Sequence, residues 1–251
     1  MLPGRGATSF VIRARADGAK PLNLRDSRAK VTTHREPRAV AASKMTLKAE
    51  NLHLWRGDRH VLQGVSFTAS EGECLQITGS NGAGKTSLLR TLSGLMYPEE
   101  GTLTWRGQGI RSDLLAYHSE LAYIGHEPPL KADLTPRENL HYWIGIRWPV
   151  SREETEEALE RVGARGWSDR PVRTLSAGQK RRVALAGLTL MMDVPLWLLD
   201  EPTTNLDKQG QHLVGTLIEE HLGRGGLVVA AIHHELSVRT TAMRRLELAR
   251  E

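Results

Sequence analysis

The feature that most constrains this chain is a glycine-rich segment placed between a strand-like stretch and a helix-like one. Residues 79–86 read Gly-Ser-Asn-Gly-Ala-Gly-Lys-Thr and fit the pattern G-x-x-x-x-G-K-[ST] at every defined position. An apolar stretch at 74–77 precedes the segment, and residues 87–92 follow it with helical spacing. A strand, a tight glycine turn and a helix in this order predict a loop whose backbone N–H groups enclose phosphate oxygens.

Two side chains of this phosphate loop have predicted roles of their own. Lys85 is expected to reach the β- and γ-phosphates of a nucleotide, and the hydroxyl of Thr86 is expected to bind Mg²⁺. The predicted cofactor-binding residues in and beside the loop are Gly79, Ser80, Asn81, Gly82, Ala83, Gly84, Lys85, Thr86 and Ser87.

A second element with predicted chemistry lies much further along the chain. Residues 196–201 form an apolar strand that ends in two acids, Asp200 and Glu201. A strand of this kind is buried between helices, so a carboxylate at its end can reach a metal beside the phosphate loop. We predict that Asp200 binds Mg²⁺, through water, and that Glu201 is a catalytic residue that polarises the attacking water.

Strand-like and helical patterns alternate along the rest of the chain. Strand-like patterns are found at 46–54, 61–67, 102–105, 121–125, 195–199 and 227–232, and helical patterns at 152–162 (capped by Ser151), from about Ala177 onward, and at 209–222. Strands that alternate with helices predict an α/β fold whose sheet is largely parallel and covered on both faces.

The charge of the chain is unevenly distributed. The whole sequence has 34 Lys and Arg against 29 Asp and Glu, but residues 1–44 alone carry ten basic and three acidic side chains. The remaining residues, 45–251, are therefore nearly neutral, and the basic balance of the whole chain does not predict nucleic acid as a partner. The single Cys excludes a disulfide framework and a cysteine-based metal cluster within the chain.

Residues 1–44 are interpreted as a basic extension, disordered or mis-assigned, that precedes a folded domain spanning 45–251. Their composition is compatible with translation that begins at Met45, with a native disordered tail, and with an organelle-targeting segment.

Further motifs give the chain a family resemblance. Residues 175–179 read Leu-Ser-Ala-Gly-Gln and resemble the LSGGQ signature of ABC ATPases, with Ala177 in place of the more usual Gly. Residues 204–207 resemble the D-loop of that family, and His233, directly after a predicted strand, resembles its switch histidine. Together with the phosphate loop and the acid-ended strand, these motifs occur in the family's order over most of residues 46–251.

The resemblance implies a P-loop NTPase fold with a RecA-like parallel-sheet core, a small antiparallel β-subdomain, and an inserted helical subdomain at roughly 127–185. It implies ATP and Mg²⁺ as cofactors and a head-to-tail ATPase dimer, in which ATP lies between the phosphate loop of one subunit and the signature helix of the other. Ser176, as the N-cap of that helix, and Gly178 are then expected to contact ATP, and His233 is expected to act at the γ-phosphate.

The chain departs from the usual family pattern at two positions. The residue after the strand at 121–125 is His126, where most ABC ATPases have Gln; residues 134–140, which resemble the family's T-x-x-E-N-L segment, fix this register. We assign His126 to the predicted metal site and expect the change to alter coupling to a membrane partner more than nucleotide binding. The position expected to stack on adenine holds Arg56, with Trp55 one residue earlier, and the sequence leaves both candidates open.

A narrower resemblance rests on Gly125-His126, the short domain, the opening of the phosphate loop and residues 226–233. These features resemble the ATP-binding subunits of haem exporters in cytochrome c maturation. The resemblance implies transmembrane ABC subunits as partners, a peripheral position on the cytoplasmic face of the bacterial inner membrane, and hydrolysis linked to haem export or to release of a haem-loaded chaperone. The alternatives are a different exported substrate, a soluble ABC ATPase acting on ribosomes or DNA, and a module that binds nucleotide without hydrolysing it.

Overall fold

A computed structural model of the chain describes residues 44–232 and 243–248. Its strands are β1 (Thr46–Arg56), β2 (Arg59–Ser70), β3 (Cys74–Thr78), β4 (Glu100–Trp105), β5 (Gln108–Gly109), β6 (Leu121–Ile124), β7 (Leu196–Asp200), β8 (Leu227–Ala231) and β9 (Met243–Glu247). Its helices are α1 (Lys85–Leu92), α2 (Leu114–Ser119), α3 (Pro136–Gly145), α4 (Arg152–Arg161), α5 (Ala177–Leu190) and α6 (Lys208–Gly223), with short 3₁₀ helices η1 (Arg165–Trp167) and η2 (Val172–Thr174).

The strands form two sheets of different kinds. Strands β2, β1, β4 and β5, in that order, pair antiparallel, whereas β6, β7, β8, β3 and β9, in that order, pair parallel throughout. The predicted parallel core and small antiparallel sheet are therefore confirmed. Short α2 and the edge strand β9 had no counterpart among the predicted elements.

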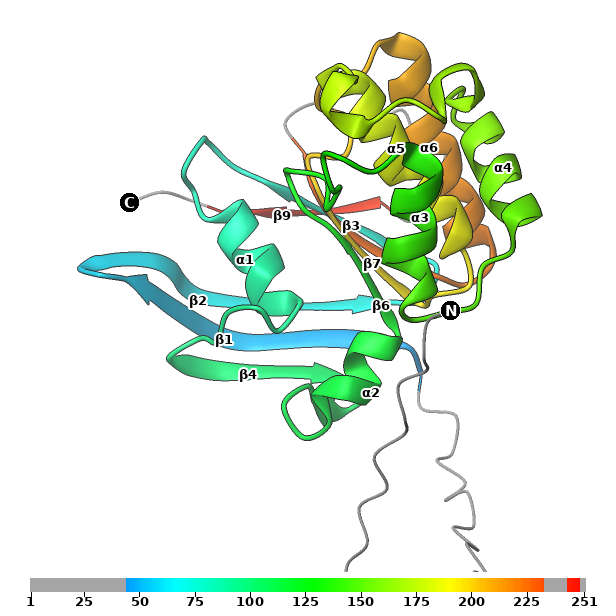
Figure 1. The fold of residues 1–251 in the computed structure, drawn as a ribbon. Coiled ribbons are helices and arrows are strands. Elements are labelled where there is room, and N and C mark those ends of the chain that lie inside the picture. Colours follow the sequence, from blue (N-terminus) through cyan, green and yellow to red (C-terminus); the bar gives the residue numbers. More distant parts are fainter. Residues whose placement is uncertain (1–43, 233–242, 249–251) are drawn as a thin grey trace, which may run out of the picture. The chain divides into compact units, whose positions relative to one another are not determined.

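The central strands β3, β7 and β8 of the parallel sheet are buried on both faces, as the sequence pattern predicts, whereas the edge strand β9 is largely exposed. Along β8, the side chains of Val228 and Ala230 belong to one hydrophobic cluster, and those of Leu227, Val229 and Ala231 belong to another. The alternation follows from strand geometry, which turns successive side chains to opposite faces. Figure 1 shows what covers them: α3, α4, α5 and α6 gather on one side of the sheet, and α1 lies on the side of β1 and β2.

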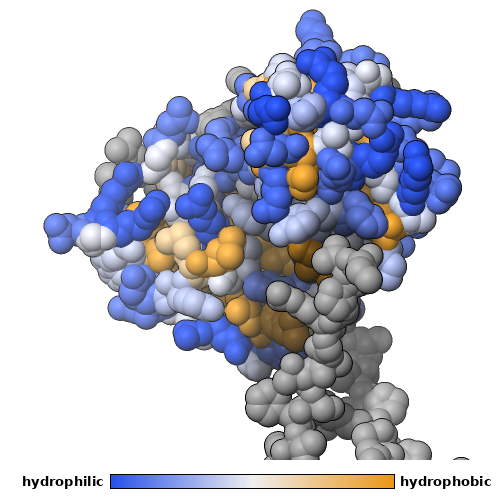
Figure 2. Space-filling view, in the orientation of Figure 1, coloured by the Kyte–Doolittle hydropathy of each residue, from blue (hydrophilic) through white to orange (hydrophobic). Residues whose placement is uncertain are grey.

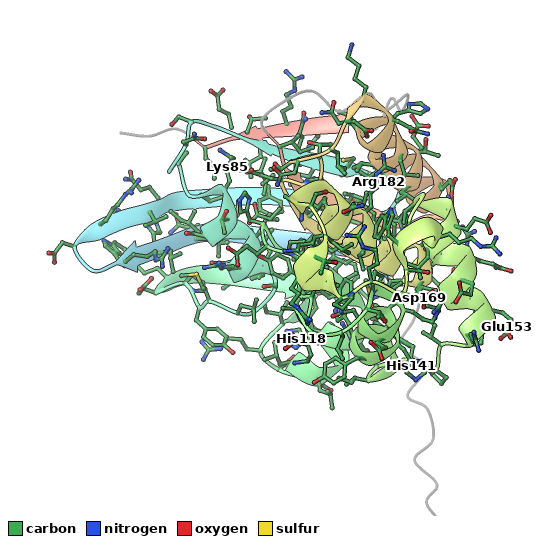
Figure 3. The ribbon with its side chains drawn as sticks, turned by 45° about the horizontal axis from the view of Figure 1, so that its top comes forward. Lys85, His118, His141, Glu153, Asp169 and Arg182 are labelled. Carbon is green, nitrogen blue, oxygen red and sulfur yellow. The ribbon has the colours of Figure 1, made fainter. Side chains whose placement is uncertain are left out.

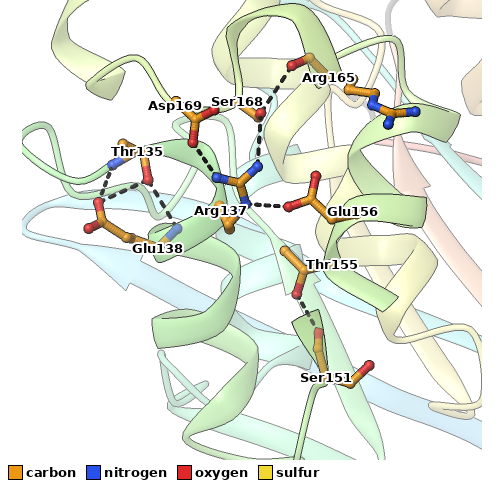
Figure 4. Close-up of polar contacts among 9 residues, drawn as sticks. All are labelled: Thr135, Arg137, Glu138, Ser151, Thr155, Glu156, Arg165, Ser168 and Asp169. Atoms are coloured by element: carbon orange, nitrogen blue, oxygen red, sulfur yellow. Dashed lines mark hydrogen bonds and ion pairs between the residues drawn. The ribbon is translucent and has the colours of Figure 1, made fainter. Parts of the chain in front are cut away.

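In the helical region, capping boxes begin two of the helices, and one arginine links neighbouring segments. Thr135 and Ser151 begin α3 and α4 with capping boxes, in which the hydroxyl accepts from a backbone N–H and a Glu accepts in return. Arg137 of α3 pairs with Glu156 of α4 and with Asp169, just beyond η1 (Figure 4). The guanidinium thus joins three segments at one point on the helical face.

The surface carries apolar side chains as well as charged ones. In Figure 2, hydrophobic residues gather over the centre and lower part of the visible face, while the upper part is mostly hydrophilic. Among the described residues, the large apolar side chains that are exposed are Leu95, Tyr97, Leu115, Tyr142 and Ile146. Within residues 44–232 and 243–248, none of the helices combines the length and apolar character that a bilayer crossing requires.

Candidate functional site

The glycine-rich loop connects the end of β3 to the start of α1. Lys85, the first residue of α1, is 6% exposed, and its Nζ donates hydrogen bonds to the carbonyls of Gly79 (2.8 Å) and Ser80 (3.1 Å). Gly84 caps α1 with φ of 100°, and a Cβ there would lie 2.9 Å from the Val61 carbonyl. Only glycine fits this left-handed, crowded position, which explains its place in the motif.

The residues of the loop and of the first turn of α1 differ in their exposure to solvent. Ser80, Asn81 and Gly82 are exposed, whereas Ala83 and Ser87 are buried. The Gly82 carbonyl accepts a hydrogen bond of 2.5 Å from the guanidinium of Arg59, the first residue of β2. Lys85, at the start of α1, is labelled in Figure 3.

A cavity of about 700 Å³ opens at this loop and unites segments that are distant in sequence. It is lined by Arg56, Arg59, Val61, Asn81, Gly82, Gly84, Lys85, Thr86, Ser87, His126 and Glu201. Most of the residues that sequence reasoning assigned to one site thus meet around a single cavity of a size that suits a small ligand.

Asp200, the last residue of β7, is 1% exposed and directly precedes Glu201, which lines the cavity. Burial raises the pKa of its carboxyl; a hydrogen bond with Thr86 opposes the rise, and the neighbouring charge of Glu201 adds to it. Among the described residues, Oδ2 of Asp200 has no hydrogen-bond partner. A buried carboxylate oxygen without a partner, next to a hydroxyl, is a donor set that suits a hard cation such as Mg²⁺.

Glu201 occupies a strained position directly after the strand. Its φ is 50°, in the left-handed region, and its backbone N–H donates to the Ala231 carbonyl at 2.9 Å. The Oε2 atom accepts a hydrogen bond from the Thr204 hydroxyl at 3.2 Å and lies 3.3 Å from Nδ1 of His126. The carboxylate is therefore held at the cavity by two side chains from different loops.

The signature segment forms the predicted helix cap. The Ser176 hydroxyl accepts from the Gln179 N–H, and the Gln179 side chain accepts from the Ser176 N–H, so the predicted N-cap is confirmed. A Cβ on Gly178 would lie 2.6 Å from the Asn205 carbonyl, which gives this glycine a packing reason within the chain. The described residues that line the cavity include neither Ser176 nor Gly178.

The cavity distinguishes the two candidates for stacking on a base. The ring of Trp55 stacks on His60 at 3.9 Å between centroids and 8° between planes. The lining of the cavity includes Arg56 and Arg59 but, among described residues, not Trp55. Arg56 is therefore the candidate that faces the ligand space.

Two functional candidates, Arg59 and Arg181, could not be predicted from the sequence. A third residue, which the sequence does predict, lies outside the described part of the chain. Arg59 lines the cavity, and Arg181 of α5 is buried and donates to the carbonyls of Asp200 and Glu201. The sequence around a single arginine in a strand or an amphipathic helix does not show whether its side chain is at a functional site or exposed to solvent. Neither arginine could therefore be recognised from the sequence. His233, the predicted switch histidine, is not among the described residues.

Known proteins resemble this chain along most of its length. Residues 62–204 match the ABC transporter family. The chain is 50% identical over 198 residues to the cytochrome c biogenesis ATP-binding export protein CcmA of Methylococcus capsulatus, covering 78% of this chain and 95% of that protein. It is 45% identical over 203 residues to CcmA of Yersinia pestis, covering 81% of this chain and 93% of that protein.

Solved structures agree on the fold. An ABC transporter ATP-binding protein from Pyrococcus furiosus superimposes with a TM-score of 0.68 at 24% identity, covering 81% of this chain and 97% of that one. The phosphate loop and the acid-ended strand fall within the matched family region, and the identity to CcmA proteins extends over nearly their whole length. The chain therefore belongs to the ABC transporter ATP-binding proteins and, within them, to the CcmA family.

Proposed function

We propose that this chain is the ATP-hydrolysing subunit of an ABC exporter that serves cytochrome c biogenesis. The observation that carries the proposal is the cavity at the phosphate loop, where Lys85, Thr86, His126 and Glu201 meet. The two relatives described above are named for ATP binding and export in cytochrome c biogenesis, which supplies the process in which the hydrolysis would be used.

In the proposed reaction, the chain's residues bind the triphosphate and activate a water. The backbone N–H groups of residues 79–87 and the Lys85 ammonium hold the phosphates, a role for which Lys85 exchanges its bonds to the loop carbonyls. Glu201 polarises the attacking water, and its carboxylate is already aimed by Thr204 and His126. We keep His233 as the proposed γ-phosphate contact.

We propose that Thr86, Asp200 and His126 serve the Mg²⁺ of the nucleotide. The oxygen of Asp200 that lacks a partner supports this assignment, since a cation beside it would relieve the cost of a buried charge. The bound ion would neutralise charge that develops on the phosphate oxygens.

The signature helix has a proposed partner outside this chain's own cavity. Its exposed N-cap Ser176, with Gly178 in the first turn, would contact ATP held by a second copy or a paralogue in a head-to-tail dimer. Their absence from the described lining of the cavity supports this division of the site between two subunits.

A second cavity supports coupling to a membrane subunit. It measures about 650 Å³ and includes Leu95, Met96, Tyr123 and His126 in its lining. Because His126 lines both cavities, a partner seated in the second would lie beside a side chain that contacts Glu201. We propose transmembrane ABC subunits as this partner, with the chain peripheral on the cytoplasmic face of the inner membrane, and haem export or release of a haem-loaded chaperone as the work performed.

The proposal is tested in cells and in vitro with one substitution. Deletion of the gene should abolish covalent haem staining of membrane proteins, and the full chain should restore it, whereas Glu201→Gln should not. The purified Glu201→Gln protein should still bind ATP but lose turnover. Glu153→Gln, an exposed acid in the first turn of α4, is the matched control and should behave as wild type. Covalent haem that is unaffected by the deletion would point to a different exported substrate; normal hydrolysis by Glu201→Gln would refute the catalytic assignment.

A further inference from the structure

Arg181 is a buried cation that is not among the described residues that line the ligand cavity. It lies in the second turn of α5, five residues after the Ser176 cap, and is 2% exposed. Burying an arginine costs free energy unless each of its N–H donors has a hydrogen-bond partner. The partners of Arg181 therefore indicate its role.

Its hydrogen bonds converge on two of the loops that form the proposed catalytic site. Nη1 donates to the Gly125 carbonyl at 2.9 Å, directly before His126. Nη2 donates to the carbonyl of Asp200 at 2.8 Å and also to that of Glu201. One planar guanidinium thus joins the ends of β6 and β7 to α5.

The contact to Glu201 falls where the backbone is under strain. A non-glycine residue at φ of 50° is held there only when its surroundings define it tightly. The Glu201 N–H donates to the Ala231 carbonyl, and the Glu201 C=O accepts from Arg181 and from the Thr204 N–H at 3.1 Å, so the peptide groups on both sides of its Cα are anchored. These hydrogen bonds, one of them from Arg181, set the direction in which the carboxylate side chain leaves the backbone.

We propose that Arg181 is a positioning residue that fixes the Glu201 and His126 loops relative to each other and to the signature helix. It acts through the backbone and does not touch the nucleotide. The inference rests on the proposed function, because it takes Glu201 to be the group that polarises water. It predicts a selective loss: turnover depends on Arg181, and ATP affinity, which comes from the phosphate loop, does not.

The electrostatics are consistent with a structural cation at this point. Burial lowers the pKa of Arg181, while the nearby charges of Asp200 and Glu201 raise it. The guanidinium in turn lowers the pKa of Asp200, against the effect of burial. The cation therefore also supports the charged form of the acid next to it.

The test compares Arg181→Lys and Arg181→Met with a control arginine. Lys keeps the charge but lacks the fork that reaches several carbonyls, and Met keeps only the approximate length. Arg147→Met is the control, because Arg147 donates to the Leu121 carbonyl at the opposite end of β6. Each full-length protein is checked for its unfolding temperature, then measured for kcat, KM and the Kd of a fluorescent ATP analogue.

We expect Arg181→Lys to lose about tenfold in kcat and Arg181→Met on the order of 100-fold, since small displacements of a reacting group have effects of this size. The KM and Kd should change by less than about twofold, and Arg147→Met should keep wild-type kinetics. If Arg181→Met does not fold, the decision rests on Arg181→Lys. A wild-type kcat in the folded Lys variant, or a loss confined to KM and Kd, would overturn the inference.

Glu201→Gln separates this inference from the proposed function. If Glu201→Gln loses turnover and Arg181→Lys does not, the catalytic assignment stands and the positioning role is wrong. If Glu201→Gln hydrolyses ATP normally, the proposed function itself fails. If the catalytic role of Glu201 and the positioning role of Arg181 are both correct, the double variant Arg181→Lys/Glu201→Gln should hydrolyse ATP no more slowly than Glu201→Gln alone. The reason is that Gln at position 201 has no catalytic activity that a change of its position could reduce.

Discussion

Nδ1 of His126 lies 3.3 Å from Oε2 of Glu201, so the loop after β6 and the end of β7 meet through their side chains. The imidazole is 57% exposed, whereas the Glu201 side chain is 20% exposed. The contact thus links the exposed side chain of His126, which is accessible to a partner protein, to the proposed catalytic acid. Most ABC ATPases have glutamine at the position of His126.

Replacing His126 should therefore affect turnover more than binding. In His126→Ala, Glu201 loses a side chain that lies beside its Oε2 atom, and we expect kcat to fall about tenfold with KM nearly unchanged, because small displacements of a reacting group have effects of this size. His126→Gln retains an N–H donor and should recover most of the rate. Steady-state ATPase kinetics measure both. Equal kcat for His126→Ala and wild type would show that the contact between His126 and Glu201 does not contribute to turnover.

Arg56 should contribute to ATP affinity and Trp55 should not. Arg56 lines the cavity, whereas the Trp55 ring stacks on His60. A guanidinium over a base contributes about 0.5–2 kcal/mol, so Arg56→Ala should weaken binding roughly two- to thirtyfold. Titration with a fluorescent ATP analogue measures the change. A larger loss in Trp55→Ala, in a protein with unchanged unfolding temperature, would assign the base to the indole instead.

His221 should make the stability of the fold depend on pH. Its ring, 1% exposed, stacks on Trp197 at 4.0 Å and bonds the Met192 carbonyl through Nδ1. Burial lowers the pKa of His221 below its ordinary value of 6.5, so the unfolded chain takes up a proton before the folded one as pH falls. This histidine's contribution is complete above about pH 7 and declines below 6.5.

His221→Phe keeps an aromatic ring over Trp197 but cannot take up a proton. Urea unfolding of both proteins between pH 7.5 and 5 should therefore give a smaller loss of unfolding free energy for the variant than for wild type. Parallel curves for the two proteins would contradict the prediction.

Cys74 should be unreactive in the native protein. It lies at the start of β3 with no exposed surface, and burial, with a smaller effect of Glu73, raises the pKa of its thiol to about 12. A thiol with this pKa holds about a thousandth of the thiolate of an ordinary cysteine at pH 8. A thiol-reactive dye should label the chain's single cysteine at pH 8 only after urea is added. Rapid labelling without urea would show that β3 opens locally.

Sequence by itself determined the parts of this protein that depend on local pattern. The phosphate loop, the acid-ended strand and the Ser176 cap each follow from a few adjacent residues, because turn glycines, capping hydroxyls and buried strands have short-range signatures. The parallel direction of the strands in the core sheet followed from the alternation of strands and helices along the chain.

Tertiary structure alone decided which side chains meet. Trp55 and Arg56 are neighbours on β1, and the register of β1 against β2 shifts between Leu54 and Trp55, so the residue facing the cavity depends on pairing that the sequence does not reveal. The guanidinium of Arg181 is buried where the carbonyls of Gly125 and Asp200, distant in sequence, accept its hydrogen bonds. Such contacts form only once the parallel sheet has assembled, because strands that are distant along the chain fix the position of each partner.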